Sequence, residues 1–344
     1  MSKRSIWGLA ILASLGGGTA LTIAGCSGGS ANEVELLHVS YDPTRELFEA
    51  VNTTFASEYN TQNSPHVSIR QSHGGSASQA RSVIDGLEAD IVSLPLWSDV
   101  DAIRKSGLID ADWEERFPNH SLPYFSTIVF VVREGNPKQI KDWADLVSGD
   151  VKVITPSPKT SGNGKLSFLA AWGSVLLRGG SRDDAIKYVT ELYRRVPVLD
   201  SGARGATTTF AQKGQGDVHL TWENEAQLEV RESGNKLEIV YPPLSIRAEP
   251  KVAVVDSNVK RHGTTKAAEA YLNFLYTPAG QEIVAKNFYR PINEDVLANH
   301  AQTFPTVELF TIDKISTDWD AAAQEFFAEG AVFDNIFDTA SQGK

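Results

Sequence analysis

Three short loops rich in serine and glycine contain residue types that can hold an anion. Their sequences are SHGGSAS at 72–78, TSGNG at 160–164 and DSGAR at 200–204. Each loop follows an apolar stretch and precedes residues with helical spacing. Glycine lets the backbone approach a ligand closely, and the first N–H groups of a helix have no partner within it. Because the helix dipole is positive at that end, each loop is a potential anion site.

The first loop leads into a clearly amphipathic helix. Ser76 is followed three residues later by Gln79, which is the spacing of a capping box, so the helix is predicted to begin at about Ser76. Residues 73–75 then form the loop that precedes it. The apolar positions on one helical face are Ala80, Val83, Ile84 and Leu87. Taken alone, this stretch fits a plain helix cap without a ligand better than an anion site.

The second and third loops repeat the arrangement. GNGK at 162–165 is similar to a phosphate loop, but position 159 is lysine and Leu166 follows Lys165, so the nucleotide-binding spacing fails. The third loop precedes a helix that carries Ala206 and Phe210. In open α/β sheets, ligands bind at the carboxyl ends of the strands. Three loops that each join a strand to a helix therefore favour one shared binding edge.

The surrounding elements predict an α/β protein with two lobes. Strands and helices alternate along the chain, which is typical of mainly parallel sheets flanked by helices. The two α/β units are expected to meet twice, near 117–125 and near 241–250. This predicts a discontinuous lobe I, made of residues 35–120 and 246–344, with lobe II inserted between them at 121–245.

The N-terminus has the layout of an export signal. Lys3 and Arg4 precede an apolar run that is too short to span a bilayer, which predicts a signal peptide at 1–25. IAGC at 23–26 resembles a bacterial lipobox, whose cysteine carries the lipid, and Cys26 is the only cysteine in the chain. An ordinary signal with a chance cysteine is the less favoured alternative. Residues 26–34 are predicted to be a flexible tether.

Charge and cysteine content exclude several classes of protein. The 344-residue chain has a net charge of −11, and removal of the predicted signal peptide, with its two cations and no acid, makes it more acidic. An acidic protein does not attract nucleic acid, and it repels anions at long range. Any anion site must therefore work through short, directed hydrogen bonds. With one cysteine there is no internal disulfide, so stability must come from the core.

Several longer strings resemble the bacterial periplasmic sulfate-binding proteins, the solute receptors of sulfate/thiosulfate ABC importers. The strings are LLHVSYDPTREL, RQSHGGSASQARSVIDGLEAD, STIVFVVREGNPKQIKDW, VITPSPKTSG, LDSGARGATTTF, WENEA and KNFYRP. The resemblance covers residues 35 to 335 approximately. It implies a periplasmic-binding-protein fold with two crossover strands, and a ligand buried in the cleft between the lobes. It also implies a monomer that delivers its anion to a membrane permease and needs no cofactor or metal.

The resemblance implies a set of neutral sulfate ligands, one residue at a time. These are Ser76, Ser161, Gly162, Asn163, Ala203 and Trp222. Position 163 is usually glycine in the family, so Asn163 keeps the main-chain donor but puts its geometry in doubt. From the residues alone, Trp222 fits a core tryptophan better. With the resemblance, its indole N–H becomes a ligand.

Three further residues are implied to brace the loops rather than to touch the anion. Asp42 and Arg204 match bracing positions of the family, and His73 is expected to hold its own loop. Pro95 and Trp97 depart from the family pattern, and the sequence gives no reason for them. The predicted export signal and lipobox place the protein at the outer face of a bacterial membrane, periplasmic or at the cell surface, and Cys26 is expected to be its one membrane anchor.

The chemistry of such a site suits sulfate, although other functions stay open. Sulfate is fully deprotonated at neutral pH, so a pocket of donors satisfies it, whereas phosphate keeps a proton and needs an acceptor. Thiosulfate, molybdate and phosphate remain alternative ligands. A sulfate- or phosphate-ester hydrolase is less favoured, because no nucleophile motif and no metal-ligand histidine spacing occurs. An adhesin or structural lipoprotein, without a cleft, is the third alternative.

Overall fold

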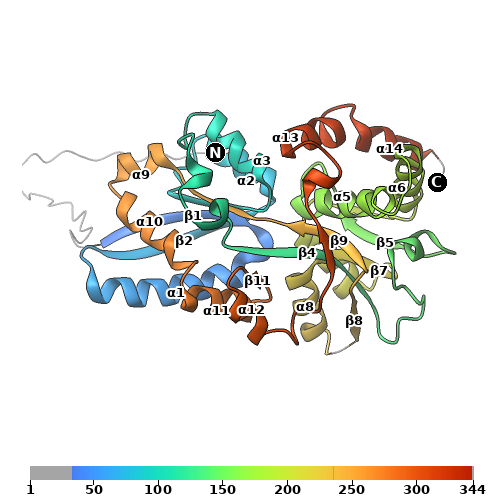
Figure 1. The fold of residues 1–344 in the computed structure, drawn as a ribbon, viewed down its shortest axis with the longest axis horizontal. Helices are drawn as coiled ribbons and strands as arrows, with labels where there is room; N and C mark the ends of the chain where they lie inside the picture. Colours follow the sequence, from blue (N-terminus) through green and yellow to red (C-terminus); the bar gives the residue numbers. More distant parts are fainter. Residues whose placement is uncertain (1–32, 235, 343–344) are drawn as a thin grey trace, which may run out of the picture. The chain divides into compact units, whose positions relative to one another are not determined.

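Two β-sheets organise the chain in the computed structural model, which describes residues 33–234 and 236–342 (Figure 1). The described residues belong to one compact unit. We call each sheet, together with the helices that pack on it, a lobe. The predicted signal peptide and Cys26 lie outside the described residues. Of the predicted tether, Glu33 and Val34 are described, and strand β1 already includes them.

The first sheet has four strands in the order β10-β3-β1-β2. Its strands are β1 (Glu33–Tyr41), β2 (His66–Gly74), β3 (Ile91–Leu94) and β10 (Lys251–Val254). Strand β1 pairs in parallel with β2 and β3, and only β10 is antiparallel. Successive side chains face opposite sides of a strand. Leu36 accordingly belongs to one hydrophobic cluster and Leu37 to another, so both faces of the sheet are covered.

Helices cover both faces of this first sheet. Figure 1 shows α1 on one side and α2 with α3 on the other. The helices of lobe I are α1 (Arg45–Gln62), α2 (Ser76–Ile84), α3 (Trp97–Lys105), α4 (Pro118–Ser121), α9 (Asp256–His262), α10 (Thr265–Phe274), α11 (Pro278–Lys286) and α12 (Glu294–Asn299). The break between α10 and α11 falls at Pro278, because proline lacks the N–H that continues a helix.

The second sheet has eight strands, and β4 lies at its centre. Its main order is β12-β9-β4-β7-β5-β6, and β8 and β11 also pair with β4. The strands are β4 (Tyr124–Arg133), β5 (Val153–Pro156), β6 (Leu199–Asp200), β7 (Val218–Trp222), β8 (Leu237–Val240), β9 (Leu244–Ala248), β11 (Arg290–Pro291) and β12 (Glu308–Phe310). Strand β4 is antiparallel to each of its partners, whereas β5 pairs in parallel with β6 and β7. This sheet is therefore mixed. Strand β4 runs from the cleft into lobe II, whereas β5 and β7 run in the opposite direction, toward the cleft.

Helices also flank the second sheet. They are α5 (Gly162–Leu176), α6 (Arg182–Arg194), α7 (Ala203–Thr207), α8 (Glu223–Glu232), α13 (Trp319–Ala322) and α14 (Val332–Ser341). Ser181 caps α6 and forms a capping box with Asp184. Most of α5 is buried, which fits its apolar sequence.

The chain passes between the sheets at the two predicted places and at a third. The predicted passages are the entry into β4 and the short link from β9 to β10. The third lies between α12 and β12, where the chain returns to lobe II (Figure 1). The sequence analysis placed all of 246–344 in lobe I, but residues 308–341 pack on lobe II. The apolar residues Phe326, Phe333 and Ile336 join the core around α5 and α6.

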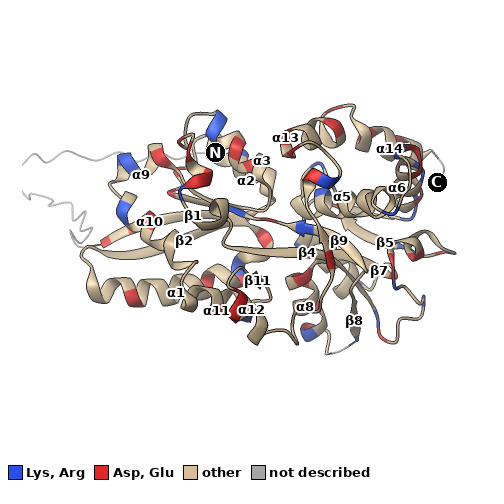
Figure 2. Cartoon of the chain, in the orientation of Figure 1, with Lys and Arg blue, Asp and Glu red and all other residues tan. Residues whose placement is uncertain are grey.

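Charged residues of both signs are interspersed over the two lobes (Figure 2). Neither lobe therefore has charged residues of one sign alone. Within 33–234 and 236–342, no helix is both long and apolar enough to cross a membrane.

Candidate functional site

A small cavity lies where the two lobes meet, and all six predicted anion ligands line it. It is small and partly open to solvent. Lobe I contributes Tyr41, Asp42, Pro43, Gly74, Gly75, Ser76 and Pro95 to its walls, and lobe II contributes Ser161, Gly162, Asn163, Gly202, Ala203 and Trp222. The predicted bracing residue Asp42 also lines the cavity, whereas His73 and Arg204 lie behind its walls.

Three helices begin at this cavity, which leaves backbone N–H groups without a partner in their own helix. The first bonds within each helix are donated by the N–H groups of Gln79 in α2, Lys165 in α5 and Ala206 in α7. The amides that precede them at the cavity are those of Ser76, Gly162, Asn163 and Ala203. Unpaired first-turn amides and positive dipole ends attract an anion. A fourth helix, α8, begins directly after Trp222.

Ser76 begins α2, as predicted, but the predicted capping box is wrong. The cap is Gly75, and no side chain caps this helix. Ser76 Oγ instead donates a hydrogen bond to a carboxylate oxygen of Asp99, on α3. Gln79 Nε2 donates to the carbonyl of Ser40 at 3.3 Å. The capping box does not form because the Asp99 carboxylate and the Ser40 carbonyl, which come from other parts of the chain, bind the two side chains instead. The Ser76 hydroxyl is thus engaged, and its backbone N–H is left for a ligand.

The second loop gives α5 a side-chain cap. Ser161 Oγ accepts a hydrogen bond from the Gly164 N–H at 3.4 Å. The Asn163 side chain has its own contacts: its Nδ2 donates to Thr221 Oγ1 at 3.4 Å, and its Oδ1 accepts from Ser167 Oγ at 2.9 Å. These contacts explain how asparagine replaces the glycine expected at position 163. The side chain bonds to residues of α5 and β7, and Asn163 still lines the cavity.

The remaining predicted ligands are Ala203 and Trp222. Ala203 is the first residue of α7 and is buried. Trp222 ends β7 and is 1% exposed, and its ring centroid lies 5.6 Å from that of Tyr41. No acceptor for its indole N–H occurs among the described residues. A buried indole N–H normally has a partner. An unpaired donor that lines a cavity therefore favours the ligand interpretation of Trp222 over the core interpretation.

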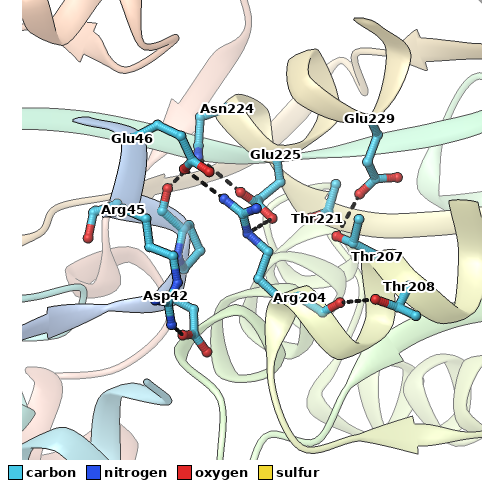
Figure 3. A network of polar contacts seen from close by, with 12 residues as sticks. Asp42, Arg45, Glu46, Arg204, Thr207, Thr208, Thr221, Asn224, Glu225 and Glu229 are labelled. Carbon is cyan, nitrogen blue, oxygen red and sulfur yellow. Dashed lines mark hydrogen bonds and ion pairs between the residues drawn. The ribbon is translucent and has the colours of Figure 1, made fainter. Parts of the chain in front are cut away.

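A network of ion pairs lies behind the third loop (Figure 3). Arg204 Nη2 lies 2.8 Å from Glu46 Oε2, and Arg204 Nε lies 3.0 Å from Glu225 Oε2. Asp42 Oδ1 accepts from Arg45 Nη2 at 2.8 Å. Arg204 thus fixes the start of α7 without lining the cavity, which is consistent with the predicted bracing role.

His73 lies near the end of β2 rather than in a loop. Its Nδ1 is 2.8 Å from Ser40 Oγ, and its Nε2 bonds to Gln71 Oε1. Burial, together with the charge of Arg45, lowers the pKa of His73 to about 4. The ring is therefore neutral at neutral pH and tied to two side chains. These contacts favour the predicted bracing role over that of a catalytic base.

The lobes approach so closely at the cavity that two glycines are required there. A Cβ at Gly75 would lie 2.9 Å from the carbonyl oxygen of Thr160, and a Cβ at Gly162 would lie 2.8 Å from Pro95 Cγ. Both contacts join lobe I to lobe II. A side chain at either glycine would hold the lobes apart. Pro95, which had no explanation from the sequence, is thus one wall of the closed cavity.

Some residues near the cavity had no clear signal in the sequence. Helix α3, with Asp99 in its first turn, was not predicted from the sequence. Lys165 Nζ lies 3.9 Å from Asp99 Oδ1, so this pair joins α5 to α3 across the cleft. Trp97, the other unexplained residue, donates its indole N–H to Glu114 at 2.8 Å and serves lobe I. Pairs so distant in sequence cannot be read from local patterns.

The lining of the cavity is rich in donors and has no cation. No lysine or arginine lines it, and its one acid, Asp42, is paired with Arg45. Backbone amides, helix ends and the indole of Trp222 can therefore carry the recognition of an anion. Within the described ranges, no three His, Cys, Asp or Glu side chains are arranged to hold a metal ion.

Comparison with known proteins defines the class. The family model for bacterial extracellular solute-binding protein matches residues 37–290. The chain therefore belongs to this family of solute-binding receptors, and its two-lobed fold is that of the periplasmic binding proteins.

The similar relatives narrow the class further. The sulfate-binding protein of Escherichia coli K12 is 53% identical over 308 residues, which cover 89% of this chain and 94% of that protein. The thiosulfate-binding protein of Pseudomonas aeruginosa is 46% identical over 313 residues, covering 90% of this chain and 94% of the relative. Among solved structures, the sulfate-binding protein SubI from Mycobacterium tuberculosis H37Rv superimposes with a TM-score of 0.78 at 33% identity. That match covers 86% of this chain and 99% of SubI.

Proposed function

We propose that the chain is an extracytoplasmic receptor that binds sulfate, with thiosulfate as a second ligand. One observation carries the proposal: the first-turn amides of three helices and the unpaired indole N–H of Trp222 line one cavity without a cation. These donors match a tetrahedral dianion whose oxygens only accept. The names of the similar relatives, one sulfate-binding and one thiosulfate-binding, support both ligands.

The same donors explain why phosphate would be rejected. Phosphate near neutral pH keeps at least one proton, and a buried P–OH would face a donor instead of an acceptor. A buried polar group without its partner costs about 1–3 kcal/mol. The Asp42 carboxylate, held by Arg45, is the one acid in the lining. Selectivity against phosphate would therefore come from protonation of the ligand, whereas molybdate, which carries no proton at neutral pH, would be rejected by its larger size.

We further propose that the receptor delivers its ligand to a sulfate/thiosulfate ABC importer. The two lobes would close over the anion about the crossing segments and present the closed shape to the permease. Anchoring through a lipid on Cys26 would keep the receptor, as a monomer, at the outer face of the membrane. A Cys26→Ser variant should lose lipid labelling, and equal labelling of both proteins would contradict the anchor.

A calorimetric titration with four anions tests the ligand assignment. Sulfate and thiosulfate should bind, whereas phosphate and molybdate at the same concentrations should bind weakly or not at all. Stronger binding of phosphate or molybdate than of sulfate would contradict the proposal.

The proposed receptor is not an enzyme, and this can be tested with the same protein. We expect no release of product from aryl sulfate or aryl phosphate esters. The neutral state of His73 and its two side-chain contacts support this expectation. Turnover that sulfate inhibits would favour the hydrolase alternative.

A further inference from the structure

The two walls of the cavity differ in their chemistry. All of the proposed anion ligands except Ser76 belong to lobe II. Lobe I adds Ser76, but it also contributes Pro43 and Pro95 to the lining. Proline has no backbone N–H, so neither residue can donate a main-chain hydrogen bond to a ligand. Part of the lobe I wall therefore presents carbon to a ligand, where lobe II presents N–H groups.

Pro95 is in direct contact with the second anion-binding loop. A Cβ built on Gly162 would lie 2.8 Å from Pro95 Cγ and 3.6 Å from Pro95 Cβ. The same point is 3.6 Å from Ser76 Cβ. The proline ring therefore lies beside two proposed ligands, one from each lobe.

The chain holds Pro95 firmly in this place. Leu94, the last residue of β3, is buried in a core cluster of lobe I, and Leu96 is buried in the core cluster of lobe II. Pro95 is itself buried between them, and its ring fixes the backbone angle φ. Because protein interiors are closely packed, a side chain held on both sides gives little room to a ligand that is too large.

Thiosulfate differs from sulfate by a single atom. An outer sulfur replaces one oxygen, and this sulfur is larger, lies farther from the central atom and accepts weaker hydrogen bonds. If it faced a buried N–H, that donor would be poorly paired, which is unfavourable. Against a carbon surface no donor is left without a partner. The carbon wall of lobe I is therefore the place in the cavity that suits the outer sulfur.

We propose that Pro95 determines how strongly the receptor prefers sulfate to thiosulfate. The proposal rests on the proposed function, since it assumes that these anions occupy the cavity. The outer sulfur of thiosulfate lies against the ring of Pro95, which has no N–H to leave unpaired. Because the same ring is in contact with Gly162, the space for the sulfur is small. Pro95 thus admits thiosulfate by its chemistry and restricts it by its size.

The test measures the Kd for sulfate and the Kd for thiosulfate by calorimetry, in the wild type and in Pro95→Ala. The informative quantity is the ratio of the thiosulfate Kd to the sulfate Kd, because a general change in stability affects both values alike. One methylene more or less in a fitted pocket changes affinity about 10- to 200-fold. Alanine lacks two of the ring carbons, so the ratio should fall at least about tenfold in Pro95→Ala, through tighter binding of thiosulfate.

Two further variants separate the size of the side chain from other effects. Alanine introduces a backbone N–H that proline lacks, and Pro95→Val introduces the same N–H without removing bulk. Pro95→Val should therefore keep the wild-type ratio or raise it. Pro43→Ala shortens the other proline of the wall and should change the ratio less than Pro95→Ala does.

A crystal structure of the wild type with thiosulfate tests the proposal without any substitution. The outer sulfur should be in van der Waals contact with the ring of Pro95, and the oxygens should face the N–H groups of lobe II. An outer sulfur that faces the lobe II amides would overturn the role of Pro95.

The outcomes separate this proposal from the proposed function. A wild type that binds neither anion contradicts the proposed function and this proposal with it. A wild type that binds sulfate, with an unchanged ratio in Pro95→Ala, overturns the role of Pro95 alone. An equal fall of the ratio in Pro95→Val or in Pro43→Ala would overturn it as well, and so would tighter binding of thiosulfate than of sulfate by the wild type.

Discussion

The substitution Trp222→Phe removes one hydrogen-bond donor from the cavity and leaves an aromatic ring in place. In the structure Trp222 lines the cavity, and its indole N–H has no acceptor among the described residues. If sulfate occupies the cavity, the N–H donates to a buried, charged acceptor. A hydrogen bond to a charged group is worth about 1.5–3 kcal/mol, so the Kd for sulfate should rise about ten- to a hundredfold.

The smaller ring will also cost stability, which must be separated from the loss of the donor. Trp222 is 1% exposed, and its truncation should lower the free energy of unfolding by about 1–3 kcal/mol. Trp172→Phe is the matched control. Trp172 is equally buried, stacks on Phe168 in α5, and does not line the cavity.

Calorimetric titration of sulfate and thermal unfolding should be measured on both variants. Both should unfold at a lower temperature, but only Trp222→Phe should lose affinity. Wild-type affinity in Trp222→Phe would refute the assignment of the indole as a ligand. An equal loss of affinity in Trp172→Phe would attribute the effect to packing.

Other substitutions test the walls and the bracing of the cavity. Gly162→Ala should weaken sulfate binding at least tenfold, because a Cβ at this position would lie 2.8 Å from Pro95 Cγ. Adding Pro95→Ala to this variant should restore part of the affinity. An unchanged Kd in Gly162→Ala would show that the lobes need not approach so closely. Ser161→Ala should raise the Kd for sulfate about tenfold or more, because it removes a hydroxyl that is a proposed ligand. Ser76→Ala should raise the Kd less, because alanine keeps the backbone N–H that is the proposed ligand at this position. A larger effect of Ser76→Ala than of Ser161→Ala would refute these two assignments. The pKa of His73 is about 4 in the folded protein and 6.5 in the unfolded chain, so between these two values His73 takes up a proton more readily when the chain is unfolded. The free energy of unfolding should therefore fall as the pH falls from 6.5 to 4. Denaturant titrations should show a weaker pH dependence in His73→Asn, and an unchanged dependence would contradict the lowered pKa.

Local patterns in the sequence predicted the elements that carry the site. The loops at 72–78, 160–164 and 200–204 each join a strand to a helix, and all three meet at the cavity. This worked because strand alternation, helical spacing and glycine are properties of short segments. The pattern alone did not show that the loops share one ligand or that Trp222 joins them. Those expectations came from the family resemblance.

Contacts between distant segments could not be predicted. Ser76 donates to Asp99 instead of capping its helix, and Arg204 pairs with Glu46, 158 positions away. Residues 308–341 were assigned to lobe I because they follow its helices in sequence, yet their aromatic side chains complete the core of lobe II. In each case a tertiary partner offers more buried area or a stronger acceptor than the local alternative does.

A crystal structure of the protein with selenate tests the central claim most directly, because anomalous scattering locates selenium in a sulfate-like dianion. The account predicts one selenate in the cavity, within hydrogen-bond distance of the amides of Ser76, Gly162, Asn163 and Ala203 and of Trp222 Nε1. No lysine or arginine side chain should touch it. Selenate bound elsewhere, or held directly by Lys165 or Arg204, would contradict a site made of neutral donors.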